Sequence, residues 1–208
     1  MIIETIVVGP LQVNCYLVGC EKSREAAVID PGDDVERILA ALKSADLKAE
    51  YIINTHEHFD HVGANKRLCE ATGAKILAHS ASADEIINIS SRALLWGMRA
   101  EDSPPVDRKL ADGDLVEIGE SVSLKVLSTP GHSLGSISLV GAGVAFVGDL
   151  IFSGSIGRTD FPGGDYETLI KSVRDKIFPL GDEVVLYSGH GPATTIGRER
   201  ATNPFFTA

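Results

Sequence analysis

This sequence of 208 residues lacks long apolar runs, an excess of basic residues and a secretory leader. No apolar stretch is long enough to cross a bilayer, so no membrane-spanning helix is expected. Residues 1–4 read Met-Ile-Ile-Glu, without the basic region and apolar core of a secretory signal, which predicts a cytoplasmic location. Lys and Arg number 19 against 29 Asp and Glu, and the net charge of -10 does not favour a cationic groove for nucleic acid.

Cysteine is scarce as well. The three cysteines, Cys15, Cys20 and Cys69, are odd in number and lack the spacing of a thiolate metal site. Their number and spacing predict free thiols in a reducing compartment. A disulfide between Cys15 and Cys20 is the alternative.

The rest of the composition is that of an ordinary globular protein, with 44% hydrophobic and 23% charged residues. Short apolar runs alternate with helical spacing, which indicates an α/β chain of one large domain or two small ones. The predicted strands are Ile2–Val8, Val13–Gly19, Ala26–Asp30, Tyr51–Asn54, Lys75–Ala78, Leu115–Ile118, Val122–Ser128, Ser136–Val140, Val144–Val147 and Val184–Tyr187. The predicted helices are 34–45, Asn65–Thr72 and Tyr166–Ile177, whereas 80–112 is ambiguous and a tail begins at Ser188.

Polar motifs directly follow four of the predicted strands. They contain His56, His132, Asp149 and His190, each just beyond the carboxyl end of an apolar run. His132 and His190 also lie in glycine-rich segments, where the backbone can approach a ligand closely. Loops at strand ends, held by a rigid sheet, are where sites are usually built.

The run from Thr55 to His61 has the pattern His-x-His-x-Asp-His. In an extended loop, residues two apart project to the same side, so His56 and His58 can bind one ion. Asp60 and His61 then point elsewhere and can serve a second ion. The alternative is a polar loop in which Asp60 caps a helix. A donor set of imidazoles and carboxylates without thiolates suits zinc, iron or manganese.

These segments together resemble the metallo-β-lactamase superfamily, and the resemblance spans nearly the whole chain. It implies a four-layer αββα sandwich, a single domain over 1–208 and two divalent metal ions, zinc in the first place with iron or manganese as alternatives. By motif, His56, His58 and His132 would bind the first ion. The resemblance places the second ion on Asp60, His61 and His190, with Asp149 bridging both ions.

Within the superfamily, Gly154–Gly164 and the tail Thr202–Phe205 are similar to compact bacterial members of the glyoxalase II branch, the hydroxyacylglutathione hydrolases. The resemblance implies hydrolysis of glutathione thioesters such as S-lactoylglutathione, a small-molecule substrate, by a monomer or small homo-oligomer. Larger members carry an additional C-terminal helical region that helps to hold glutathione. The chain ends 18 residues after His190, so the compact form without that region is expected.

The implied reaction is attack on the thioester carbonyl by a hydroxide held between the two ions. Asp60 is predicted to orient this nucleophile and to accept its proton. Arg158 is a candidate clamp for a substrate carboxylate, because a planar guanidinium pairs well with carboxylates. A surface salt bridge is the alternative for Arg158. We expect His79 to be structural, Trp96 and Met98 to be core or lid residues, and Asp30 and Gly32 to shape a turn near the metal loops.

Three other functions fit parts of the pattern. Mononuclear iron persulfide dioxygenases resemble this chain in the histidine run and in Gly157–Phe161, but they would leave Asp60, His61 and His190 without a full metal role. A lactone or β-lactam hydrolase would use the same nucleophile. A purely structural metal site normally has four ligands, whereas seven donors favour two open ions.

Overall fold

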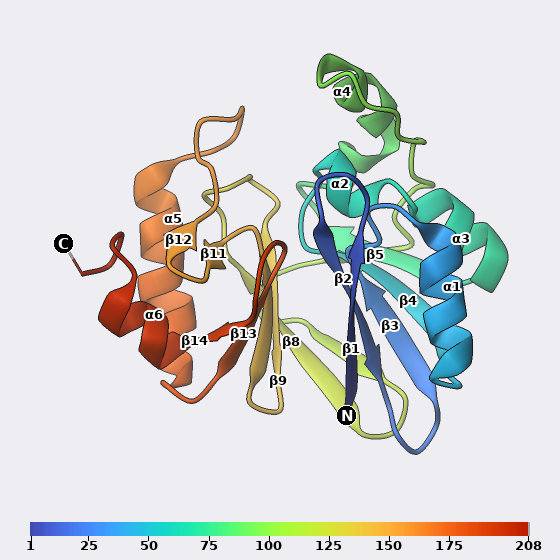
Figure 1. Ribbon diagram of the computed structural model, residues 1–208, viewed down its shortest axis with the longest axis horizontal. Coiled ribbons are helices and arrows are strands. Elements are labelled where there is room, and N and C mark those ends of the chain that lie inside the picture. Colours follow the sequence, from blue (N-terminus) through green and yellow to red (C-terminus); the bar gives the residue numbers. More distant parts are fainter. Residues whose placement is uncertain (208) are drawn as a thin grey trace.

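Two β-sheets packed face to face form the centre of the computed structural model, which describes residues 1–207 (Figure 1). In these residues each of the two large sheets has six strands, and helices cover the outer face of each sheet. The order of layers is therefore helix, sheet, sheet, helix. Loops from both sheets meet at one end of this sandwich, the upper end in Figure 1.

The first sheet has the strand order β1-β2-β3-β4-β5-β6. Its first three strands are antiparallel, and β3 to β6 run parallel because helical connections return the chain between them. The strands are β1 (Ile2–Val8), β2 (Val13–Gly19), β3 (Glu25–Ile29), β4 (Lys48–Asn54), β5 (Lys75–His79) and β6 (Arg108–Leu110). The helices that accompany them are α1 (Val35–Ser44), the short α2 (Phe59–Val62), α3 (Asn65–Thr72) and α4 (Ile89–Leu95), the last preceded by a 3-10 turn at Ile86–Asn88.

The second sheet has the order β14-β13-β10-β9-β8-β7, and its only parallel pair within residues 1–207 is β10 with β13. A separate hairpin of β11 (Ile151–Phe152) and β12 (Ser155–Ile156) leads toward the outer helices. The strands are β7 (Leu115–Ile118), β8 (Val122–Ser128), β9 (Ile137–Gly141), β10 (Val144–Gly148), β13 (Val185–Ser188) and β14 (Thr194–Thr195). The covering helices are α5 (Tyr166–Ser172), which continues as a π-helical turn at Val173–Ile177 and a 3-10 turn at Phe178–Leu180, and α6 (Ile196–Thr202).

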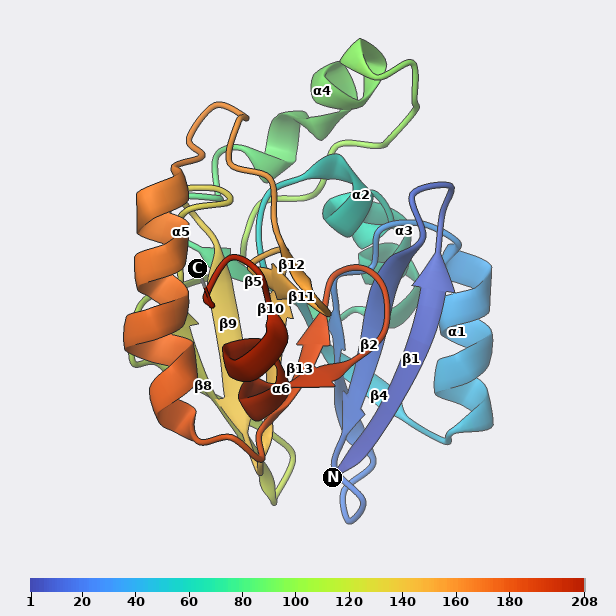
Figure 2. The same cartoon turned by 60° about the vertical axis from the view of Figure 1, so that its left-hand side comes forward.

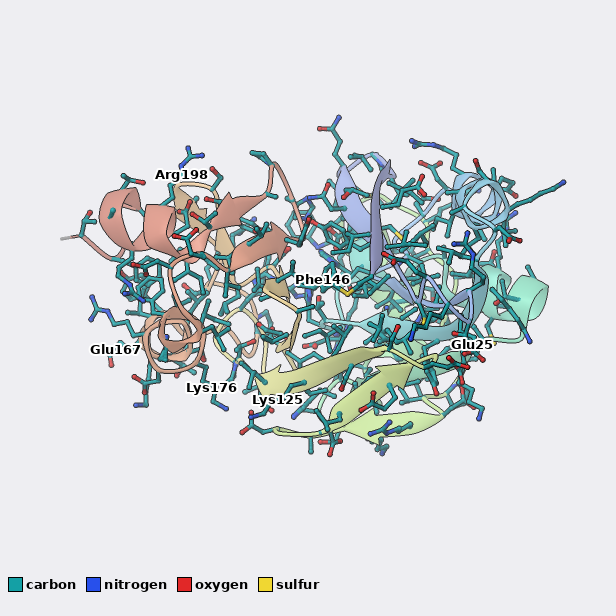
Figure 3. The ribbon with its side chains drawn as sticks, turned by 90° about the horizontal axis from the view of Figure 1, so that it is seen from below. Glu25, Lys125, Phe146, Glu167, Lys176 and Arg198 are labelled. Carbon is teal, nitrogen blue, oxygen red and sulfur yellow. The ribbon has the colours of Figure 1, made fainter. Side chains whose placement is uncertain are left out.

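Three separate apolar cores hold the four layers together. Ile38 of α1 and Leu68 of α3 pack on the outer face of the first sheet, and Leu169 of α5 packs on the second. The middle core lies between the sheets and contains Phe146 and Ile53, both fully buried. Figure 3 shows the Phe146 label at this central position. Because both faces of the sheets are covered, strands such as β2 are buried along their whole length.

The layers of the fold explain where the cysteine side chains lie. Cys15 faces the outer core, Cys20 faces the core between the sheets, and all three cysteines are free thiols. The two side chains lie on opposite faces because residues an odd number of positions apart alternate along a strand. The predicted free thiols are confirmed, and the alternative disulfide between Cys15 and Cys20 is wrong.

Most predicted elements are present with ends shifted by a few residues. The helix predicted over 34–45 spans Val35–Ser44, and Asn65–Thr72 is a helix with the predicted bounds. The tail predicted from Ser188 is instead partly regular, since it forms β14 and α6, and the Thr195 hydroxyl caps α6 by accepting from the Arg198 backbone N–H. No helix in residues 1–207 combines the length and the apolar character that a membrane span requires.

Candidate metal centre

The polar motifs meet at one end of the sandwich, where the loops that follow strands of both sheets come together (Figures 1 and 2). The first sheet contributes the segment after β4, which continues into α2. The second sheet contributes the loops after β8, β10 and β13. The predicted ligands brought together by these loops are His56, His58, Asp60, His61, His132, Asp149 and His190.

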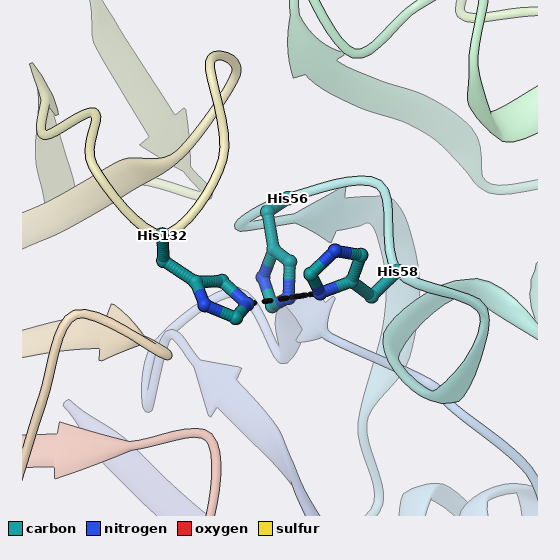
Figure 4. Close-up of side chains that lie close together, drawn as sticks. All are labelled: His56, His58 and His132. Carbon is teal, nitrogen blue, oxygen red and sulfur yellow. Dashed lines mark hydrogen bonds between the residues drawn. The ribbon is translucent and has the colours of Figure 1, made fainter. Parts of the chain in front are cut away.

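Three imidazoles form the first group. His58 Nδ1 lies 3.1 Å from His56 Nε2 and 2.9 Å from His132 Nε2 (Figure 4). In a tetrahedral zinc site, bonds of 2.0–2.1 Å place neighbouring ligand nitrogens about 3.3 Å apart. The three nitrogens therefore already have nearly the spacing that one ion requires.

Asp60, His61 and His190 form the second group. The Asp60 carboxylate lies 3.5 Å from His190 Nε2 and 3.8 Å from His61 Nε2. Asp60 and His61 are neighbours in α2, and the His61 ring adjoins that of His56, with 4.1 Å between the ring centres. Asp30, His56 and His61 form a further close group, so the predicted division of the run between two ions stays a prediction.

Asp149 lies between the two groups. Its Oδ2 is 3.7 Å from His132 Nε2 and 3.6 Å from His190 Nε2, whereas its Oδ1 is 3.5 Å from His61 Nε2. Among the described residues, Asp149 Oδ1 and His61 Nε2 are buried and have no hydrogen-bond partner. Such orphaned atoms are costly, and divalent cations held by this nitrogen and oxygen donor set would satisfy them.

The protonation of the histidines differs between the groups. Burial lowers the pKa of His56 and His58, which keeps these imidazoles neutral, the form that binds metal. Burial also opposes a charge on His61, but the carboxylates of Asp149, Asp60 and Asp30 outweigh it and raise the pKa of His61 well above its usual range. A bound cation would balance the charge of these carboxylates in place of the proton on His61.

The stability of metal-free protein should therefore depend on pH through His58. Burial, followed by the neighbouring His132, lowers the pKa of His58 from 6.5 to about 4. Between these pH values the unfolded chain takes up a proton that the folded chain does not, so stability falls as the pH is lowered through this window. Urea unfolding of the chelator-treated protein, and of the chelator-treated His58→Asn variant, measures this dependence of stability on pH. The unfolding free energy of the protein with His58, minus that of His58→Asn, should fall from pH 7 to pH 4. A difference that stays constant over this range would contradict the prediction.

Asp30 lies beside the second group and orients His61 through a hydrogen bond. Its carboxylate accepts hydrogen bonds from the Thr55 backbone N–H at 2.7 Å, the Thr55 hydroxyl at 2.7 Å and His61 Nδ1 at 3.0 Å. The last bond places the proton on Nδ1 and leaves Nε2 to face Asp60 and Asp149. Asp30 does turn the chain, with a φ of 52°, as predicted. Its contact with His61 was not predicted, although a carboxylate after a buried strand was a signal for it.

Glu57, the spacer inside the histidine run, was also missed. Its Oε2 accepts from the Ser82 hydroxyl at 2.7 Å and from the Ser133 hydroxyl at 2.9 Å. Ser133 follows His132, so Glu57 ties the loop of the first histidines to the loop that carries the third. No local pattern marks such a contact, because the hydroxyls come from distant segments.

The His190 loop is anchored by the first sheet. Asn14 Nδ2 donates to the backbone carbonyls of Ser188 and Gly191, at 2.9 and 2.8 Å. Gly189 must be glycine, because a Cβ there would lie 2.2 Å from Asp149 Oδ1 and 2.7 Å from His61 Cε1. The close backbone approach expected of glycine in this loop is thus present.

The Arg158 guanidinium is occupied by its own neighbour. It donates to both carboxylate oxygens of Asp160, at 2.9 and 2.7 Å, and lies 4.2 Å from the centre of the Phe161 ring. The structure thus shows the surface salt bridge, and the clamp for a substrate carboxylate stays a prediction. The Arg158 backbone carbonyl accepts from His132 Nδ1 at 2.7 Å, which orients that ring.

The structure also shows where His79, Trp96 and Met98 lie. His79 Nδ1 accepts from the Ala81 backbone N–H at 3.2 Å, in keeping with a structural role. Trp96 is exposed and therefore not a core residue, whereas Met98 lines a cavity of about 210 Å³ that reaches Asp60.

The sequence of the protein matches a known protein family. The sequence profile described as the metallo-beta-lactamase superfamily matches residues 8–190, which include every predicted ligand. The chain belongs to the metallo-beta-lactamase superfamily. The αββα fold predicted from the resemblance is confirmed, and the protein is a metallo-hydrolase of this superfamily.

Several members of the superfamily are similar along their whole length. Hydroxyacylglutathione hydrolase GloC of Haemophilus influenzae is 39% identical over 217 aligned positions, which cover 100% of this chain and 99% of GloC. The crystal structure of the BLEG-1 B3 metallo-beta-lactamase has 38% identity and a TM-score of 0.92, with 100% of both chains covered. The crystal structure of TTHA1623 in a di-iron-bound form has 38% identity and a TM-score of 0.89, covering 97% of this chain and 99% of the other.

Proposed function

We propose that the protein hydrolyses thioesters, S-lactoylglutathione among them, at a centre of two divalent metal ions. His56, His58 and His132 hold one ion, and the second group of Asp60, His61 and His190 holds the other. The observation that carries the proposal is the position of Asp149, whose carboxylate lies within 3.7 Å of histidines from both groups. The similarity to GloC over the whole chain supports a glutathione thioester as the substrate.

Bound divalent ions would supply a water of lowered pKa and polarise the thioester carbonyl. The chain's own residues have separate tasks. Asp60 accepts the proton of the attacking water, since its carboxylate is partly exposed and lies beside His190. Asp30 and the Arg158 carbonyl keep His61 and His132 in the tautomers that face the site. The acyl carbon gains oxygen from water, the carbon–sulfur bond breaks, and the thiol leaves.

Zinc is the proposed metal, because the donor set consists of imidazoles and carboxylates. Iron is the alternative, supported by the di-iron form of a structure with 38% identity. The free thiols of Cys15, Cys20 and Cys69 support a reducing, cytoplasmic location.

A β-lactam hydrolase is the second candidate, supported by the similarity to BLEG-1 at a TM-score of 0.92. The same site would attack either acyl compound, so the metal groups do not separate the two. A mononuclear iron persulfide dioxygenase is less well supported, because the complete second group would have no metal to bind.

One panel of assays with purified protein tests these alternatives. We expect S-lactoylglutathione to be hydrolysed, with about two metal ions per chain by elemental analysis. A chelator should abolish the activity, and added zinc or iron should restore it. The same preparation is tested with a β-lactam, a lactone and glutathione persulfide. Rapid β-lactam hydrolysis or oxygen uptake, without thioester hydrolysis, would overturn the proposal.

A further inference from the structure

Exposed apolar side chains gather beside the first histidine group. The Phe161 ring lies edge-on to His58, with 5.5 Å between ring centres, and 6.5 Å from His132. Trp96 packs edge-on against the outer side of Phe161, at 5.7 Å. An aromatic surface therefore extends without interruption from two predicted metal ligands to the outside of the protein.

Leu134 belongs to the same surface. It follows His132 by two residues, and a Cβ on Gly163 would lie 3.3 Å from its Cγ, so Leu134 packs against the Phe161 segment. Leu134 is 69% exposed and Trp96 is 53% exposed. We call Trp96, Leu134 and Phe161 the apolar rim.

Three distant parts of the chain build this rim. Trp96 ends α4, Leu134 lies between β8 and β9, and Phe161 lies between β12 and α5. In Figure 2 the α4 segment and the loop before α5 stand at the same end of the molecule as the histidine loops. Exposed apolar side chains from separate segments that adjoin a polar centre are typical of a ligand-binding surface.

The position of the rim indicates which part of a substrate covers it. The reacting carbonyl must lie at the metal centre, so a group attached to it that extends past His58 and His132 meets Phe161 first. The Arg158 guanidinium lies 4.2 Å from the centre of the Phe161 ring and 6.0 Å from that of Trp96, and its charge is compensated there by two hydrogen bonds to the Asp160 carboxylate. The rim therefore suits an uncharged, apolar group.

We propose that the apolar rim is the acyl-binding subsite, and that thioesters with an apolar acyl chain or aromatic ring are preferred over small acyl groups. This inference rests on the proposed thioester hydrolysis and adds the class of acyl group. The reaction is unchanged: water supplies the new oxygen on the acyl carbon, and the carbon–sulfur bond breaks to release an acid and a thiol.

The test is a series of acyl glutathiones with acetyl, butyryl, hexanoyl and phenylacetyl groups, assayed with the metal-loaded protein. Burial of each methylene is worth up to about fourfold in kcat/KM, so hexanoyl should exceed acetyl by at least about tenfold. Trp96→Ala and Leu134→Ala should each lower the hexanoyl-to-acetyl ratio by about threefold or more. Leu115→Ala, which removes an exposed leucine on β7, is the matched control and should leave the ratio unchanged.

The outcomes separate the two proposals. Equal kcat/KM for acetyl and hexanoyl substrates would overturn the acyl-binding subsite and leave thioester hydrolysis standing. A dimer in light scattering that dissociates in Trp96→Ala would assign the rim to self-association and also overturn the subsite. Failure to hydrolyse every thioester, by protein that contains its metal ions, would overturn the proposed function as well.

Discussion

Replacing Asp60 with alanine is expected to lower thioester turnover by at least about 100-fold, the lower end of what proton transfer contributes to catalysis. The carboxylate lies 3.5 Å from His190 Nε2 and 3.8 Å from His61 Nε2, so its loss also takes a donor from the second group. Steady-state kinetics with S-lactoylglutathione, together with the metal content of the same sample, measures both effects.

Two further variants make the Asp60 experiment specific. Asp60→Asn keeps the shape of the side chain but removes its charge, so its turnover should fall as well. Asp46→Asn is the matched control, because this carboxylate is 93% exposed, pairs only loosely with Arg24, at 3.8 Å, and lies at a φ of 51° that asparagine tolerates. An Asp60→Ala protein that retained full metal and near-full turnover would show that Asp60 has neither role.

Replacing Asp30 with alanine should have the second-largest effect, on metal affinity and on stability together. The change leaves the Thr55 N–H, the Thr55 hydroxyl and His61 Nδ1 without their buried acceptor. Loss of a partner that orients a metal ligand typically costs about 10–100-fold in metal affinity. Unsatisfied buried donors cost roughly 1–3 kcal/mol each, so the free energy of unfolding should fall by a few kcal/mol.

Metal titrations distinguish a positioning role for Asp30 from a purely structural one. The ion bound by His61 should be weakened more than the ion bound by the first histidine group, because His61 is hydrogen-bonded to Asp30 directly, whereas His56 is linked to it only through the Thr55 hydroxyl. Asp46→Asn again serves as the exposed control. Equal weakening of both ions, or a loss of stability with normal metal affinity, would contradict the positioning role.

Local patterns in the sequence were sufficient for most elements and indicated the candidate donors, whose role as metal ligands stays a prediction. β-branched runs and helical spacing predicted the strands and most helices, because each pattern reports burial on one or two faces of a single element. Short elements were missed, as in β14, where two residues carry too little periodicity to recognise. The spacing of His56, His58, Asp60 and His61 predicted two ligand groups, because residues two apart in an extended loop project to the same side.

Contacts between distant segments were decided only by the tertiary structure. His132 meets His58 across 74 residues, and the packing of the two sheets places it there. Asp30 reaches His61 across 31 residues and Glu57 reaches Ser133 across 76, contacts that no local period encodes. The sequence by itself thus determined which donors are available and in which loops, whereas the assembly of those loops at one end of the sandwich determined which donors lie close together and which side chains hold them.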